Sequence, residues 1–161
     1  YVVAMNMTRM ERTDTALGFF SQDVLYNWHK SVGIVLLILV FARYMWRRNT
    51  PLPDWAPGLS ERERTAVHWI ERILYICMFV MPLSGILYVM AGGYGVLFFG
   101  RWPLPNFIGE NETLALIGQQ THRVTAYALF ITWLCHIGLV LKHQFADKDR
   151  LLNRMLPFTQ Q

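Results

Sequence analysis

The chain has 161 residues, enough for one domain covering residues 1–161, and it is more apolar than a soluble protein of this size. Hydrophobic residues make up 53% of the chain and charged residues only 16%, which insertion into a membrane explains directly. The formal net charge is +4, but no aromatic–basic repeat or groove-binding helix accompanies it, so we expect no nucleic-acid partner. Neither of the two cysteines belongs to a C-x-x-C or C-x-x-C-H motif, which argues against thiol-redox chemistry and covalently attached c-type haem.

The first predicted span covers about residues 28–47. Trp28 and Trp46 lie at its two ends, as expected of aromatic side chains at the membrane interfaces. His29 is therefore expected just inside one membrane surface. Gly33, one helical turn further on, removes a side chain from the face that His29 projects from. Such a gap suits a flat macrocycle that lies against the helix, and it equally suits close packing of a second helix.

The second predicted span covers about residues 72–92 and is the strongest spanning signal in the chain. A proline-rich linker ends the preceding helix, and Ser60 with Glu63 then matches a capping box, so the second helix is expected to begin there. Pro82 and Gly85 within the span predict a kink, which a membrane helix tolerates when its neighbours satisfy the freed carbonyl group.

The third predicted span covers about residues 120–143, after a stretch at 94–110 whose aromatic, Gly and Pro residues predict an interfacial loop. Asn111 is a candidate N-cap for this last helix. His122 and His136 are 14 residues apart, about four turns or ~21 Å of rise, so both rings project from nearly the same face. They could hold two metal-bearing groups at different depths. They could instead be ordinary polar residues, although an ionisable residue inside an apolar stretch is costly and usually functional.

The distribution of lysine and arginine predicts the orientation of the spans. Most of these residues lie in the linker between the first two spans and in the C-terminal tail, so we expect both in the cytoplasm. His29 and His122 are then level with each other at the outer surface. His136 lies deeper, and His68 begins the second helix on that same inner side. Paired imidazoles in an apolar bundle suit the axial positions of a haem iron, whereas zinc needs four adjacent ligands and a di-iron site needs companion glutamates.

Three segments resemble the bacterial cytochrome b561 family, four-helix membrane cytochromes that carry two b-type haems. They are NWHKSVGI…LVFARYMWRR, AVHWIERILY…MPLSG and QTHRVTAYALF…LCHIGLVLKHQFADKDRLLNRMLP. The resemblance implies an all-α membrane bundle in which His29 and His122 hold the iron of the outer haem and His136 is one ligand of the inner haem. The family's second inner ligand is a histidine near the start of a first helix, and residues 1–10 resemble that helix's tail. We therefore expect three spanning helices here, with the first missing or truncated, and His68 at the right depth to substitute.

The expected function is electron transfer, because two six-coordinate haems leave no open iron position for oxygen chemistry. The resemblance implies a quinone as partner in the bacterial inner membrane, with superoxide or a redox partner protein as donor on the periplasmic side. The chain would then be a quinone-linked oxidoreductase similar to a superoxide oxidase, or the cytochrome subunit of a dehydrogenase, with a homodimer as a further arrangement. The competing hypothesis is a haem-free transporter or assembly subunit in which the histidines relay protons.

Overall fold

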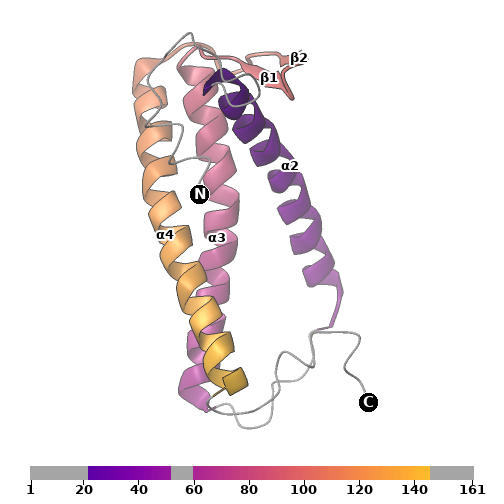
Figure 1. The fold of residues 1–161 in the computed structure, drawn as a ribbon, viewed down its shortest axis with the longest axis vertical. Helices are drawn as coiled ribbons and strands as arrows, with labels where there is room; N and C mark the ends of the chain where they lie inside the picture. The colour runs from indigo at the N-terminus through magenta and orange to yellow at the C-terminus, as the bar shows by residue number, and fades with distance from the viewer. Residues whose placement is uncertain (1–21, 52–59, 146–161) are drawn as a thin grey trace.

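The computed structural model describes residues 22–51 and 60–145, which form three long helices and one short hairpin (Figure 1). Each helix is long and apolar enough to cross a membrane, which confirms the predicted all-α membrane bundle with three spanning helices. Residues 1–21 lie outside the described residues, and with them residues 1–10, where the tail of a first helix was expected; so does the C-terminal tail. The elements in chain order are α2 (Gln22–Asn49), α3 (Glu61–Ala91), β1 (Val96–Phe98), β2 (Trp102–Leu104) and α4 (Glu112–Phe145).

Two helix starts follow from the capping residues in the sequence. The backbone N–H of Glu63 donates to Ser60 Oγ at 3.3 Å, and the N–H of Ser60 donates to the Glu63 carboxylate at 3.0 Å, which confirms the capping box of α3. Asn111 caps α4, since its side-chain oxygen accepts from the N–H of Leu114 at 3.0 Å. Helix α3 continues through Pro82, the position at which the sequence predicts a kink.

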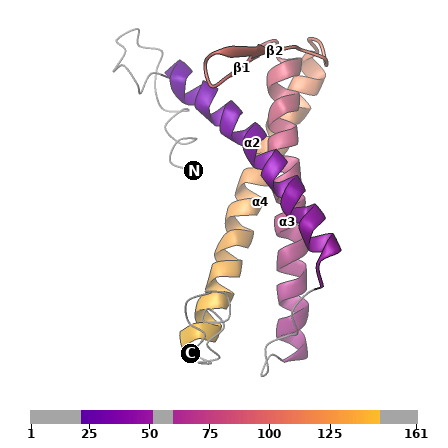
Figure 2. The same ribbon diagram turned by 90° about the vertical axis from the view of Figure 1, so that its right-hand side faces the viewer.

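Helices α3 and α4 form the most extensively packed pair, and α2 crosses them at an angle (Figure 2). Gly118 of α4 lies directly against the backbone of α3. A Cβ atom built on Gly118 would lie 2.7 Å from the backbone nitrogen of Tyr88 and 2.9 Å from its Cα. Only glycine allows the two backbones to approach so closely, as is common between membrane helices.

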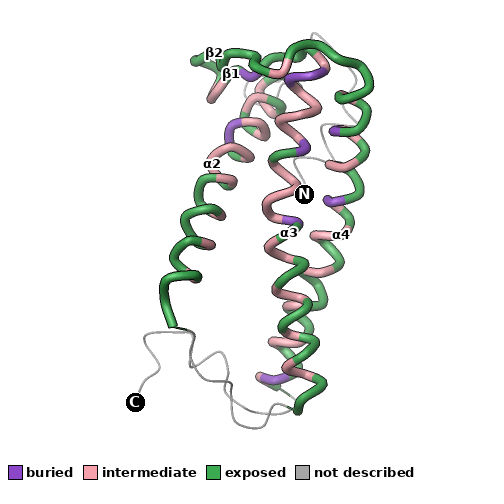
Figure 3. The backbone as a smooth tube through the Cα atoms, turned by 180° about the vertical axis from the view of Figure 1, so that it is seen from behind, coloured by how far each residue is buried: buried purple, intermediate pink, exposed green. Residues whose placement is uncertain are grey.

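Few apolar residues of the described helices are buried, and many are exposed (Figure 3). Leu39 of α2, Ile76 of α3 and Val124 of α4 are each more than half exposed. This distribution is the one expected of helices whose apolar surfaces contact lipid. The buried apolar residues of the described chain are few and lie mainly toward the end that carries the hairpin: Cys77, Met90, Ala91 and Val96.

The hairpin lies within residues 94–110, where the sequence predicts an interfacial loop. Strands β1 and β2 pair antiparallel, with Val96 opposite Leu104, and the turn between them has positive φ at Phe99 and Gly100. Strands of three residues are too short to show a periodic pattern, which is why the sequence did not reveal them. We call the end with the hairpin the outer end and the opposite end, where α2 ends and α3 begins, the inner end, following the predicted orientation.

Candidate functional site

His29 of α2 and His122 of α4 face each other at the outer end. Their ring centroids are 6.0 Å apart and their planes are nearly perpendicular, at 83°. A metal–imidazole bond is about 2 Å long, so two imidazoles on opposite sides of one metal ion have centroids roughly 6 Å apart. The observed separation therefore matches the spacing that a bis-histidine site requires, and the donor set suits an iron porphyrin.

His122 is oriented by hydrogen bonds to α3. Its Nδ1 lies 2.8 Å from the carbonyl oxygen of Met81 and 3.4 Å from the hydroxyl of Ser84. A carbonyl oxygen can only accept, so the contact with Met81 assigns the proton to Nδ1. Nε2 then keeps its lone pair for a metal. Histidine ligands in metalloproteins are commonly oriented in this way by a backbone carbonyl on the other ring nitrogen.

Gly85 makes room for the His122 ring against α3. A Cβ atom built on Gly85 would lie 3.1 Å from both Cε1 and Nδ1 of His122, closer than most side-chain contacts. The sequence interpretation linked Gly85 only to a kink in its helix. The structure gives it a second role, because a larger residue would push the ring away from the carbonyl that orients it.

Gly33 lies one turn from His29 and faces open space. A Cβ atom built on it meets no atom within 4 Å in the described part of the chain, in contrast to the crowded Gly118. The sequence left two interpretations open, helix packing and space for a flat group. No described helix packs against Gly33, so the space beside it leaves room for a flat group on this face of α2.

Ser31 joins the start of α2 to the hairpin beside His29. Its side chain is fully buried, donates to the carbonyl of Asn27 at 2.6 Å and accepts from the N–H of Phe99 at 2.7 Å. The Phe99 ring also packs edge-to-face against Trp28, with centroids 5.2 Å apart. These contacts hold the turn of α2 that carries His29. Sequence reasoning missed Ser31, for which the sole signal was a hydroxyl at the start of an apolar run.

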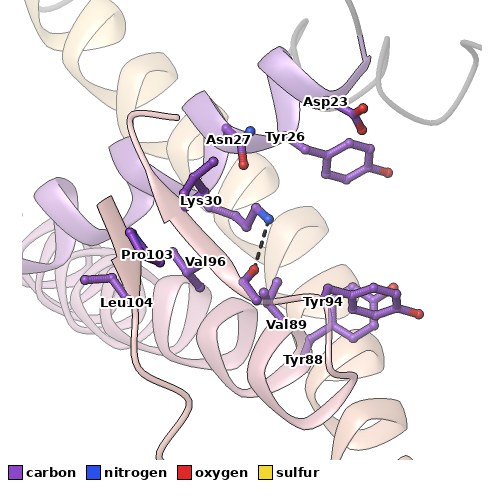
Figure 4. Close-up of a pocket in the computed structure, with 12 residues that line it drawn as sticks. Asp23, Tyr26, Asn27, Lys30, Tyr88, Val89, Tyr94, Val96, Pro103 and Leu104 are labelled. Carbon is purple, nitrogen blue, oxygen red and sulfur yellow. Dashed lines mark hydrogen bonds between the residues drawn. The ribbon is translucent and has the colours of Figure 1, made fainter. Parts of the chain in front are cut away.

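A cavity of about 740 Å³ opens next to this site, between the start of α2, the end of α3 and the hairpin (Figure 4). Lys30 extends into it and donates to the carbonyl of Gly95 at 3.1 Å. The cavity therefore combines one amine and one carboxylate with several phenol groups at the outer end. Its polar lining residues are Asp23, Tyr26, Asn27, Lys30, Tyr88 and Tyr94.

The inner histidines are not brought together in the same way. His136 is half-buried on α4, and no ring contact joins it to His68 or to any other histidine within the described ranges. His68 is exposed on α3, whereas His143 at the end of α4 is buried. Residues 22–51 and 60–145 also contain no group of three or more His, Cys, Asp or Glu side chains able to hold a metal ion. The second ligand expected for an inner haem is therefore still a prediction.

Comparison with known proteins gives consistent matches over most of the sequence. The family model described as prokaryotic cytochrome b561 matches residues 1–158. Cytochrome b561 homolog 2 of Escherichia coli (strain K12) is 32% identical over 128 residues, which cover 80% of this chain and 68% of that protein. Cytochrome b561 homolog 1 of the same strain and the probable superoxide oxidase CybB of Yersinia pestis are each 26% identical over 129 residues, covering 80% of this chain and 73% of theirs.

Proposed function

Since the chain belongs to the prokaryotic cytochrome b561 family, we propose that it transfers electrons between a donor at the outer membrane surface and a quinone in the membrane. It is a multi-pass membrane cytochrome, and membership of this family implies that it binds haem b. The observation that supports electron transfer best is the facing pair His29 and His122, with ring centroids 6.0 Å apart. We propose that this membrane is the bacterial inner membrane and that the C-terminus lies in the cytoplasm.

His29 and His122 would hold the outer haem b. The Met81 carbonyl keeps Nδ1 of His122 occupied and leaves Nε2 for the iron. The space beside Gly33 leaves one face of α2 clear for the macrocycle. When bound between two histidines, a b-type haem supplies one-electron transfer at an iron with no open coordination position.

His136 would be one ligand of a second, inner haem b. Its partner would be a histidine upstream of this sequence, or His68 of α3. The position of His136 within the apolar part of α4 supports this role, because ionisable residues inside a membrane segment usually serve a function.

The electron donor is proposed to be superoxide, with a redox partner protein as the alternative. One relative, from Yersinia pestis, is named a probable superoxide oxidase. The amine of Lys30 lines the outer cavity next to His29 and would attract an anion, while the carboxylate of Asp23 in the same cavity offsets part of that attraction. With a protein donor instead, the chain would act as the cytochrome subunit of a dehydrogenase. Reduction of the haem by superoxide, followed by reduction of added quinone, distinguishes the two in the purified protein.

The ligand pairing is tested by haem content, measured from reduced-minus-oxidised spectra of the purified protein. We expect His29→Ala and His122→Ala each to lose one haem per chain, and the double variant to lose no more than either single variant, because both residues serve one iron. His136→Ala should lose the other haem, and His68→Ala shows whether His68 is its partner. Two haems in the His29→Ala variant would refute the pairing, and a wild-type protein without haem would favour a haem-free transporter.

A further inference from the structure

A second cavity, of about 760 Å³, lies between α2 and α3 at the inner end, and His68 is the one lining residue that the proposed electron transfer involves, as an alternative haem ligand. We propose that this inner basic pocket binds the phosphate group of an anionic phospholipid. The pocket is lined by Tyr44, Arg47, Arg48, Thr50, His68, Glu71, Arg72, Tyr75 and Ile76.

The pocket carries excess positive charge. Three arginines line it against one glutamate, which leaves two positive charges in excess. Arg47 already bonds to Glu71 at 2.6 Å and lies over the ring of Tyr75. Arg48 and Arg72 form no ion pair within residues 22–51 and 60–145, so their charges are available to an anion. Arginine is well suited to this role because its planar guanidinium can donate two parallel hydrogen bonds to a phosphate.

Tyr75 supplies an unused hydroxyl group in the same pocket. Its oxygen is buried and forms no hydrogen bond within the part of the chain that the structure describes. Its ring is held in place by edge-to-face packing against Tyr44, with centroids 5.9 Å apart. A buried hydroxyl without a partner costs free energy, and a phosphate oxygen in the pocket would accept a hydrogen bond from it.

The position of the pocket points to a lipid rather than to free phosphate. It lies at the inner ends of two spanning helices, where the predicted orientation places the cytoplasmic headgroups. Ile76 lines the pocket and is 61% exposed, and Ile73 on the same helix is also exposed. An acyl chain attached to the bound phosphate could continue along these apolar side chains. Basic pockets between membrane helices on the cytoplasmic side are typical binding sites for anionic headgroups.

Native mass spectrometry of the purified, haem-loaded protein tests the proposal, with dioleoyl phosphatidylglycerol as the probe and dioleoyl phosphatidylcholine as the neutral lipid. We expect the wild type to retain more phosphatidylglycerol than phosphatidylcholine. Arg72→Gln should weaken its binding about tenfold and Tyr75→Phe about three- to tenfold, because each removes one donor to the phosphate. Arg62→Gln is the matched control, since Arg62 is exposed on α3 outside the pocket and carries the same charge.

Three results would overturn the proposal. Equal weakening by Arg62→Gln and Arg72→Gln would show that phosphatidylglycerol responds only to the general charge of the inner end. Displacement of the lipid by an equal concentration of inorganic phosphate would show that the acyl chains contribute nothing. Loss of haem from Arg72→Gln and Tyr75→Phe would show that the pocket serves the cofactor instead. Unchanged haem content together with weaker lipid binding supports the site and leaves the electron-transfer proposal unaffected.

Discussion

The outer and inner ends of the bundle are held together by different kinds of contact. At the outer end, buried or half-buried side chains bond to backbone atoms of another element, as His122 does to Met81 and Ser31 to Phe99. At the inner end, ion pairs between long side chains connect the helices, Arg47 to Glu71 and Lys142 to Glu63. A buried bond to the backbone permits little adjustment, whereas an accessible ion pair is weak and adaptable. The outer end is therefore built to hold a fixed geometry, and substitutions there should cost more.

Gly33→Leu tests the fixed geometry of the outer end and should have the largest effect. Its side chain would enter the open space beside His29, so we expect the outer haem to be lost while the apoprotein stays folded. Haem content and far-ultraviolet circular dichroism measure the two effects. Val32→Leu, which enlarges an exposed neighbour, is the control and should keep its haem. Full haem content in Gly33→Leu would mean that no macrocycle lies against this face of α2.

Gly118→Ala should destabilise the α3–α4 pair strongly. The new methyl group would lie 2.7 Å from a backbone nitrogen of α3, which cannot move as a side-chain end can. We expect a loss at or above the upper end of about 1–3 kcal/mol in the free energy of unfolding. Thermal unfolding in detergent measures it.

Gly138→Ala is the matched control at the opposite half of α4, where a Cβ atom meets nothing in the described structure. It should be neutral or stabilise the protein by up to about 1 kcal/mol, since alanine is the better helix former. Equal effects of the two substitutions would contradict the unequal packing of the two halves.

The sequence was sufficient for the parts of this molecule that depend on local pattern. Uncharged runs located the three spans, and Ser60 and Asn111 located the starts of α3 and α4. Matching depths across two crossings also predicted that His29 and His122 lie level, and the structure places their rings 6.0 Å apart. Depth can be inferred from residue spacing because a membrane helix advances by a constant rise per residue.

The sequence was insufficient where distant segments meet side by side. The bond from Phe99 to Ser31 joins residues 68 positions apart, and no periodicity links them. Gly85 shows the same limit, since its importance depends on which ring of α4 faces it. Rise along the helices predicts depth, but the rotation of each helix toward its neighbours is determined by packing.

Ser31→Ala should cost about 1–2 kcal/mol in the free energy of unfolding, because the N–H of Phe99 loses its acceptor, the hydroxyl of the fully buried Ser31. Thermal unfolding measures this loss, and a rise in hydrogen exchange at the hairpin should accompany it. Thr132→Ala is a suitable control, since that hydroxyl bonds only to its own helix at Ala128 in the described structure. If Thr132→Ala loses as much stability as Ser31→Ala, the hydrogen bond between Ser31 and Phe99 has no special role in stability.

Glu71→Gln at the inner end should have the smallest effect. It breaks the ion pair with Arg47, but both side chains are 31% exposed, so solvent already screens their attraction. Accessible ion pairs typically contribute about 0–1 kcal/mol, and the loss should shrink further at high salt. Comparing the thermal unfolding of Glu71→Gln and Ser31→Ala at two salt concentrations tests the contrast between the ends. A salt-independent loss as large as that of Ser31→Ala would show that the inner end is held as firmly as the outer one.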